Sequence, residues 1–256
     1  KTLKKWYSKQ PKSNHKKVVY LFCDEFTNFY DVEIGKDAFN LLDRLGYNLQ
    51  IINHEESGRS FISKGFLKEA KAVCNLNVEI FKDIISEETP LIGVEPSAIL
   101  TFRDEYIRLA DDKKSAEKIA KNVFTFEEFL AKEVENKNID VSLFTSEKKD
   151  IKIHGHCHQK ALSGTHSSFQ VLNIPENYVV TIISSGCCGM AGSFGYEKEH
   201  YDVSMQVGED TLFPKVRNYS AETEIAAAGT SCRHQIFDGT KRIAKHPITI
   251  LKEALL

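Results

Sequence analysis

Four cysteines lie in three short polar loops, among the residue types that commonly surround metal centres. Cys187 and Cys188 are adjacent and have glycines on both sides, Cys157 stands among histidines, and Cys232 follows the turn-like segment 229–231. Thiolates are the usual ligands of soft metals and iron–sulfur clusters. Buried structural cysteines behave as small hydrophobes and would not gather in glycine- and histidine-rich loops. We therefore predict that Cys157, Cys187, Cys188 and Cys232 bind one metal centre.

Each cysteine loop directly follows a short apolar run that is typical of a buried strand. These runs cover residues 151–153, 179–183 and 224–228. In parallel α/β sheets, ligands gather outside the carboxyl ends of the strands. The sequence therefore predicts that thiols distant along the chain meet at one edge of a sheet.

The first half of the chain shows the same alternation of strands and helices. Apolar runs at 18–22, 49–52 and 91–94 predict strands, whereas the patterns at 66–85 and 116–134 predict helices. This alternation favours the α/β class, with mainly parallel sheets covered by helices. We predict a basic linker over 1–17, a first half over 18–148 and a second half over 149–256.

The loops of the two halves correspond, which suggests an internal duplication. On this alignment Cys23 matches Cys157, Glu56-Ser57-Gly58 matches Cys187-Cys188-Gly189, and Ser97-Ala98 matches Ser231-Cys232. The second half therefore carries the intact cysteine site and the first a degenerate one. Cys23 and Cys74 are interpreted as structural.

Composition excludes several classes of function. The chain has 256 residues, 41% of them hydrophobic, and a net charge of −2, which gives no electrostatic case for binding nucleic acid. No apolar run reaches the roughly 18–20 residues of a membrane span, and no signal peptide is present. Cysteines without a secretion signal indicate a reducing compartment. We expect a cytoplasmic protein, with peripheral attachment to the inner membrane face left open. Because the chain begins at Lys1, we also expect it to be part of a longer protein.

Several motifs in order along the chain carry a family resemblance. They are His154 through Leu162, Gly186 through Tyr196, Glu199-His200-Tyr201, Leu212-Phe213-Pro214, Gly229 through Ile236 and His246-Pro247. Together they resemble the cysteine-rich CCG-domain iron–sulfur oxidoreductases, of the type found in heterodisulfide reductase and in the iron–sulfur subunit of glycolate oxidase. The sequence is most similar to the carboxyl-terminal part of bacterial FAD-linked oxidases.

The resemblance implies two pseudo-repeated Rossmann-like halves and an iron–sulfur cluster held by cysteines. In the first half, Glu56-Ser57 and Ala98 stand where the family can have cysteines, so no cluster is expected there. Gly229 stands where the last motif often has a further cysteine. The expected cofactor is therefore a four-thiolate [4Fe-4S] cluster, and FAD is expected only in a partner domain outside this chain.

Five polar side chains next to the cysteines are predicted to surround the centre and to tune it through hydrogen bonds to sulfur, with direct ligation by the histidines as the alternative. They are His154, His156, His158, Arg233 and His234.

The leading functional hypothesis is an electron-transfer module of an FAD-linked oxidoreductase, which is not catalytically complete by itself. By resemblance, its partners are flavin and ferredoxin-like domains, and the substrate is a 2-hydroxy acid such as D-lactate or glycolate. Zinc could occupy the same thiolates, so a zinc-binding structural or interaction domain remains the alternative. A thiol enzyme that uses Cys157 beside His158, or a Cys187–Cys188 disulfide, is a third class.

Overall fold

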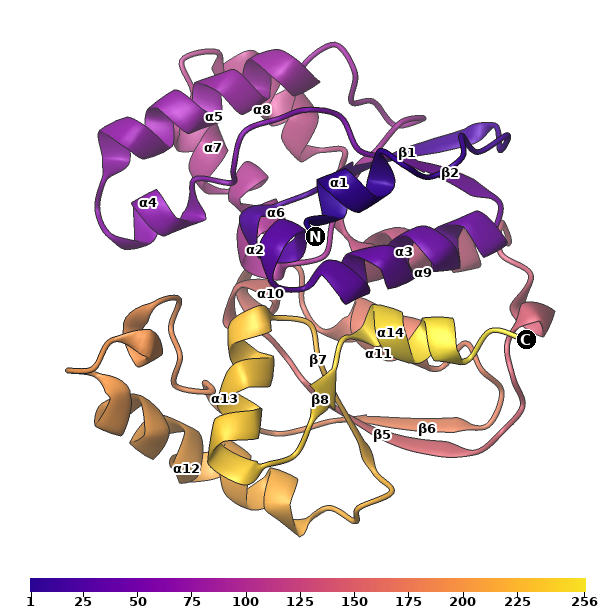
Figure 1. Cartoon of the computed structure of the whole chain (residues 1–256), viewed down its shortest axis with the longest axis vertical. Coiled ribbons are helices and arrows are strands. Elements are labelled where there is room, and N and C mark those ends of the chain that lie inside the picture. Colours follow the sequence, from indigo (N-terminus) through magenta and orange to yellow (C-terminus); the bar gives the residue numbers. More distant parts are fainter. The chain divides into compact units, whose positions relative to one another are not determined.

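Two four-stranded sheets form the framework of the molecule. The computed structural model describes residues 1–256, and every pairing between strands within the two sheets is parallel. Helices cover both sheets (Figure 1). The predicted α/β class with two Rossmann-like halves is confirmed. The chain divides into two compact units, Lys1–Phe129 and Leu130–Leu256, which are described separately.

The first unit builds its sheet in the order β2-β1-β3-β4. Its elements are α1 (Leu3–Tyr7), β1 (Lys17–Phe22), α2 (Glu25–Phe29), α3 (Val32–Arg44), β2 (Tyr47–Gln50), α4 (Arg59–Ser63), α5 (Leu67–Phe81), β3 (Leu91–Gly93), α6 (Pro96–Ile99), the 3-10 turn η1 (Leu100–Phe102), α7 (Glu105–Leu109), α8 (Lys113–Ala120) and β4 (Val123–Thr125). Helix α9 (Phe126–Glu135) crosses the boundary between the two units.

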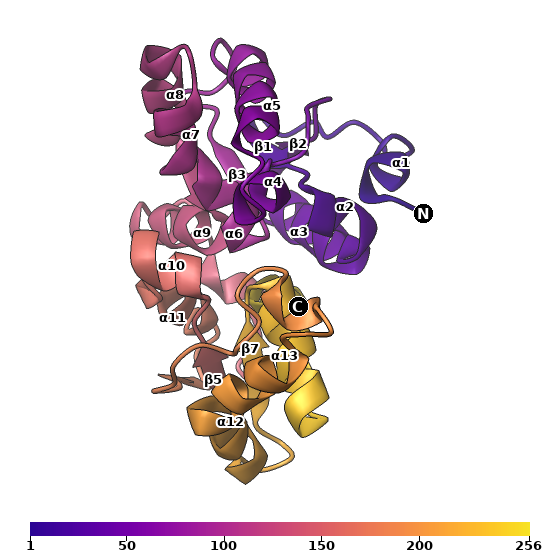
Figure 2. The ribbon, with the colours of Figure 1, turned by 90° about the vertical axis from the view of Figure 1, so that its left-hand side faces the viewer.

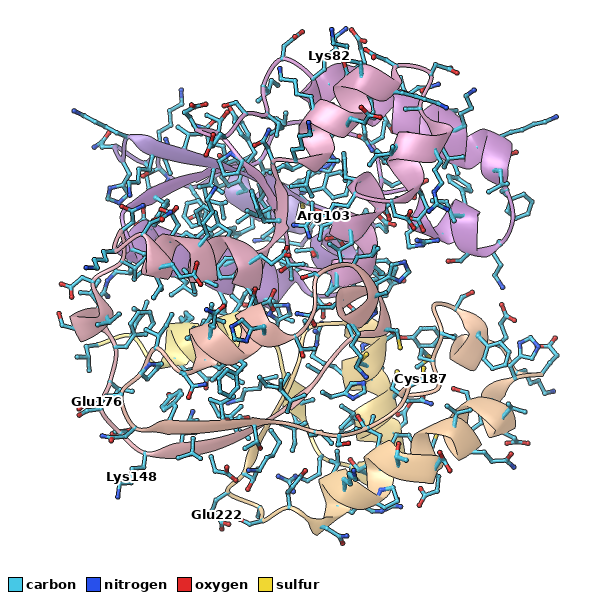
Figure 3. The ribbon with its side chains drawn as sticks, turned by 180° about the vertical axis from the view of Figure 1, so that it is seen from behind. Lys82, Arg103, Lys148, Glu176, Cys187 and Glu222 are labelled. Atoms are coloured by element: carbon cyan, nitrogen blue, oxygen red, sulfur yellow. The ribbon has the colours of Figure 1, made fainter.

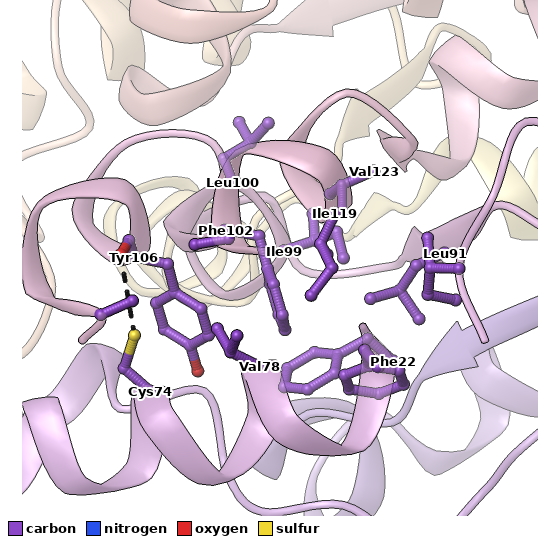
Figure 4. Packing of buried hydrophobic residues seen from close by; sticks show 14 of the residues in the cluster. Phe22, Cys74, Val78, Leu91, Ile99, Leu100, Phe102, Tyr106, Ile119 and Val123 are labelled. Atoms are coloured by element: carbon purple, nitrogen blue, oxygen red, sulfur yellow. Dashed lines mark hydrogen bonds between the residues drawn. The ribbon is translucent and has the colours of Figure 1, made fainter. Parts of the chain in front are cut away.

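A fully apolar core holds the first sheet against helix α5 and its neighbours. Phe22, at the end of β1, packs edge-on against Phe81 and Phe102. Figure 4 shows this packing, in which Cys74 lies beside Tyr106. Cys74 is completely buried, and burial raises the pKa of its thiol to about 12. Both features agree with a structural role for Cys74.

The second unit repeats the topology, with the strand order β6-β5-β7-β8. Its remaining elements are the 3-10 turn η2 (Val141–Leu143), β5 (Lys149–His154), α10 (Cys157–Leu162), α11 (His166–Leu172), β6 (Tyr178–Ile182), the 3-10 turn η3 (Phe194–Tyr196), α12 (Tyr201–Asn218), β7 (Glu224–Ala227), α13 (Thr230–Thr240), β8 (Ala244–Lys245) and α14 (Pro247–Glu253). Helices α12 and α13 pack against each other, as do α11 and α14 (Figures 1 and 2). No helix combines the length and apolar composition that crossing a membrane would require.

Three details differ from the sequence-based expectations. The helix predicted over 116–134 is wrong, because strand β4 interrupts it and pairs with β3. Residues 123–125 include a valine, a phenylalanine and a threonine, which suit a strand better than a helix. Helix α1 lies inside the segment predicted as a linker, and its Leu3 is fully buried. The division between compact units follows Phe129, whereas the sequence placed it after residue 148.

Candidate metal centre

The four predicted cysteine ligands come together at the carboxyl ends of three neighbouring strands. Cys157 is the first residue of α10, after β5; Cys187 and Cys188 follow β6; Cys232 is the third residue of α13, after β7. The Sγ atoms of Cys157 and Cys187 lie 3.7 Å apart, and those of Cys188 and Cys232 are also 3.7 Å apart. Figure 3 labels Cys187 in this region. All four thiols are free.

The Cys187-Cys188 loop is held by a backbone conformation that needs glycine. Gly189 has a φ of +95°, and a side-chain Cβ there would lie 2.0 Å from the carbonyl oxygen of Ser204 on α12. Ser204 Oγ donates to the Gly189 carbonyl, and Gln235 of α13 donates to Ser204. Helices α12 and α13 therefore set the position of both central cysteines.

Hydrogen bonding divides the four sulfurs into two donors and two acceptors. The Cys157 thiol donates to Cys187, which lowers the pKa of Cys187; the Gly189 N–H, 3.2 Å from the same sulfur, acts in the same direction. The Cys188 thiol donates to Cys232 and lowers the pKa of Cys232, and the imidazoles of His154 and His156 add to this effect. The pKa values of Cys157 and Cys188 are raised. Within each pair, the accepting thiol therefore has the lowered pKa and the donating thiol the raised one.

His154 lies within ligand distance of the two buried cysteines. It is 1% exposed, and its ligand atom, Cys188 Sγ and Cys232 Sγ all lie within 4.8 Å of one another. Its Nδ1 is 3.0 Å from Ser185 Oγ, whereas the buried Nε2 has no hydrogen-bond partner. The sequence analysis placed His154 among the residues surrounding the centre and gave direct ligation by the histidines as the alternative.

Two of the other predicted surrounding residues have backbone or tyrosine partners. Arg233 donates to the carbonyl oxygens of Ala227 and Ala228, at the end of β7. His234 Nδ1 lies 2.6 Å from the hydroxyl of Tyr196. Their tuning of a centre stays a prediction.

The ring of His156 occupies the space that a fifth thiol would need. A Cβ at Gly229 would lie 2.3 Å from Cδ2 of His156, so a cysteine at position 229 would displace this ring. His156 is the N-cap of α10: its Nδ1 accepts from the N–H of His158, and its ring is stacked on that of His158. The number of thiols that bind a centre stays a prediction.

The residues fit a soft metal centre. With Zn–S bonds of about 2.3 Å, two sulfurs on one tetrahedral ion lie about 3.7 Å apart, which equals both measured separations. Two thiolates on one iron of an iron–sulfur cluster share this local geometry, whereas thiolates on different irons lie farther apart. The donor set suits either type of centre, and the unpaired His154 nitrogen adds a fifth candidate donor.

The equivalent edge of the first sheet carries no cysteine cluster. Counting from the strand ends, Phe22 corresponds to His154 and Glu25, the first residue of α2, to Cys157. The predicted match of Cys23 to Cys157 is therefore wrong, because Cys23 stands at the position of Gly155. In the strand register, in which Tyr20 pairs with Gln50 and Lys152 with Thr181, Glu56 and Ser57 do occupy the positions of Cys187 and Cys188. Ala98 occupies that of Cys232, and Gly58 has a φ of +75° where Gly189 has +95°.

Comparison with characterised proteins identifies relatives among dehydrogenases. The chain is 25% identical over 243 residues to D-2-hydroxyglutarate dehydrogenase of Haemophilus influenzae, which covers 93% of this chain and 23% of that protein. It is 27% identical over 260 residues to a subunit of the anaerobic glycerol-3-phosphate dehydrogenase of Escherichia coli, covering 99% of this chain and 64% of that subunit. D-2-hydroxyglutarate dehydrogenase of Escherichia coli is 26% identical over 242 residues. No family model matches the chain.

The matches span only a part of each relative. The chain covers less than a quarter of the length of the D-2-hydroxyglutarate dehydrogenases and under two thirds of the glycerol-3-phosphate dehydrogenase subunit. Dehydrogenases and FAD-linked oxidases are both oxidoreductases. The comparison therefore supports the predicted resemblance at the level of that broad class. The assignment to CCG domains remains a prediction.

Proposed function

We propose that this chain is the iron–sulfur electron-transfer module of a flavin-linked dehydrogenase that oxidises a 2-hydroxy acid. The observation that carries the proposal is the meeting of Cys157, Cys187, Cys188 and Cys232 at the carboxyl ends of three neighbouring strands, in a chain similar to dehydrogenases. A bound iron–sulfur cluster would supply one-electron transfer.

The relatives support a shared role other than substrate recognition. Nearly the whole chain matches dehydrogenases named for two different substrates, D-2-hydroxyglutarate and glycerol 3-phosphate. A region common to enzymes for different substrates suits electron transfer better than recognition of one substrate. We therefore assign flavin chemistry and substrate binding to domains outside this chain, and the 2-hydroxy acid substrate class to the parent protein.

Each side of the site contributes differently to holding a centre. Cys188 and Cys232 are buried and form its inner wall, whereas Cys187 is half-buried and Cys157 is exposed. Burial excludes water from the inner sulfurs and so affects the potential of a centre. The exposed Cys157 side lies closest to solvent and is the proposed route for electrons to and from a partner domain.

A zinc-binding domain is the second candidate, and a specific observation favours it. The 3.7 Å sulfur separations equal the edge of a tetrahedron around a single zinc ion. In that case the chain would serve structure or partner binding, and the redox activity would belong elsewhere in the parent protein.

Anaerobic purification of the chain, followed by assays of iron, acid-labile sulfide and zinc, separates the two functions. We expect iron and sulfide in equal amounts, with visible charge-transfer absorption that bleaches on reduction with dithionite. Stoichiometric zinc without labile sulfide, both as purified and after anaerobic reconstitution with iron and sulfide, would overturn the electron-transfer proposal in favour of the zinc domain.

A further inference from the structure

The last residue of strand β5 is a buried histidine, and a centre held by four thiols alone gives it no role. His154 ends β5, which lies between β6 and β7, and its side chain is 1% exposed. At the equivalent position of the first sheet, Phe22 is part of an apolar core. A histidine at such a position needs partners for both ring nitrogens, since an unpaired buried polar group costs roughly 1–3 kcal/mol.

Only one of the two ring nitrogens has such a partner. Nδ1 lies 3.0 Å from the hydroxyl of Ser185, whereas Nε2 is buried without a hydrogen bond. His154, Cys188 and Cys232 offer ligand atoms that all lie within 4.8 Å of one another. The unpartnered nitrogen therefore belongs to the buried part of the thiol cluster.

We propose that His154 Nε2 is a direct ligand of the metal centre, together with Cys188 and Cys232. This proposal deepens the proposed function, because it rests on the same metal site. When the Ser185 hydroxyl accepts a hydrogen bond from Nδ1–H, the proton is on Nδ1 and Nε2 carries a lone pair that is available to a metal. Metal-binding histidines are commonly oriented in this way through their second nitrogen.

Two roles compete for this imidazole: ligation through Nε2, and a hydrogen bond to Cys232, which contributes to the lowered pKa of that thiol. The experiment below separates the two, because only ligation places the imidazole in the shell of the metal. A neutral imidazole in place of a thiolate lowers the negative charge of a centre. In Rieske clusters, histidine ligation accompanies higher reduction potentials than cysteine ligation. His154 would accordingly give an iron–sulfur centre a higher potential than four thiolates alone.

X-ray absorption at the metal edge tests the ligand directly. The full chain is loaded anaerobically with Zn²⁺ and, in a separate sample, with iron and sulfide. We expect outer-shell scattering from one imidazole in the wild-type chain, lost in His154→Ala and kept in His156→Ala. The matched control, His156, is also a buried histidine beside Cys157. We also expect Zn²⁺ affinity to fall at least tenfold in His154→Ala.

Two further results make the test decisive. His154→Cys should restore loading with a shell made only of sulfur and, in the iron form, a lower reduction potential than wild type. If His154→Ala does not fold, the wild-type spectrum still decides, because the absence of imidazole scattering in both metal forms overturns the proposal. A chain that binds neither metal overturns it as well.

The outcomes separate this proposal from the proposed function. If the zinc form shows imidazole scattering and the chain does not load an iron–sulfur cluster, His154 is a metal ligand and the electron-transfer function is rejected. Iron–sulfur loading without imidazole scattering in either metal form would reject His154 as a ligand and support electron transfer.

Discussion

The two sheets share a strand order but fill their carboxyl edges with opposite chemistry. In the second unit, Cys157, Cys187, Cys188 and Cys232 present sulfur at this edge. In the first unit, the same positions hold, in the same order, Glu25, Glu56, Ser57 and Ala98.

Hydrogen bonds link the residues at the carboxyl edge of the first sheet. Ser57 donates from its hydroxyl to Glu25 Oε1 at 2.5 Å and from its N–H to Glu25 Oε2 at 2.9 Å. Tyr106 donates to the Ser57 carbonyl, and Asn77 donates to both the Tyr106 hydroxyl and the Glu56 carbonyl.

The comparison shows that one backbone framework can carry either a polar network or a set of thiols. A left-handed glycine after the second strand and a helix start after the first and third strands bring the same positions together in both units. The residue types then decide whether that edge is a self-satisfied polar network or a set of thiols suited to a metal. The following experiments test this difference, in order of decreasing expected effect.

Cys232→Ala should abolish loading of the centre, because this buried sulfur hydrogen-bonds Cys188 and lies within ligand distance of His154. Metal and sulfide per chain, measured after anaerobic reconstitution, provide the readout. Cys23→Ala is the matched control in the first unit and should load as wild type does, since Cys23 does not occupy a ligand position. Equal loss of metal in both variants would contradict the assignment of the site to the second unit.

The two left-handed glycines should differ in their tolerance of alanine. Gly189→Ala meets both an unfavourable φ and the Ser204 carbonyl at 2.0 Å, so we expect a loss of about 4 kcal/mol in the free energy of unfolding. In Gly58→Ala the new Cβ would lie 3.6 Å from its nearest neighbour, so only the backbone cost of about 1 kcal/mol remains. Urea unfolding monitored by circular dichroism measures both, and similar losses would show that the surroundings of the two loops are less different than we propose.

The first unit should lose stability as the pH falls from about 6.5 towards 4. Burial lowers the pKa of His54 to about 4, and its Nε2 accepts the N–H of Cys23, so the folded state keeps this imidazole neutral. The unfolded chain binds a proton near pH 6.5 and the folded chain does not, so acid favours unfolding by up to roughly 3 kcal/mol.

The only tryptophan, Trp6, lies in the first unit, so its fluorescence during urea unfolding monitors this part of the chain. His54→Gln should have lower stability at neutral pH and a flatter pH profile between 6.5 and 4. If the stability of this variant falls with pH as steeply as that of the wild type, groups other than His54 cause the loss of stability.

Glu25→Ala should cost about 2 kcal/mol of stability in the first unit and leave metal loading unchanged. The substitution leaves the buried hydroxyl and N–H of Ser57 without their carboxylate partner. Trp6 fluorescence during urea unfolding reports the loss, and iron and sulfide assays report the second unit. The matched variant Tyr106→Phe removes one weaker hydrogen bond and should cost about 1 kcal/mol. Loss of metal in Glu25→Ala would contradict the assignment of metal binding to the second unit and of the polar network to the first.

Much of the fold could be predicted from local sequence patterns, and the predictions that failed did so for physical reasons. Six of the eight strands follow from apolar runs, and helix α5 follows from its periodicity. Strand β4 was missed because it runs directly into helix α9, and β8 was missed because two residues carry too little pattern. The register of Cys23 was also misjudged, because the identity of one cysteine was given more weight than distance from the strand end.

The sequence by itself determined the parallel α/β plan, the repeat and the four cysteines, because strand runs, loop glycines and reactive residue types are local properties. Only the tertiary structure decided that Glu25 stands in the place of Cys157, that the His156 ring takes the space of a fifth thiol, and that His154 lies within ligand distance of the two buried sulfurs. These outcomes depend on distances between residues far apart along the chain. Such distances are set by strand register and helix packing, and they leave no local signal in the sequence.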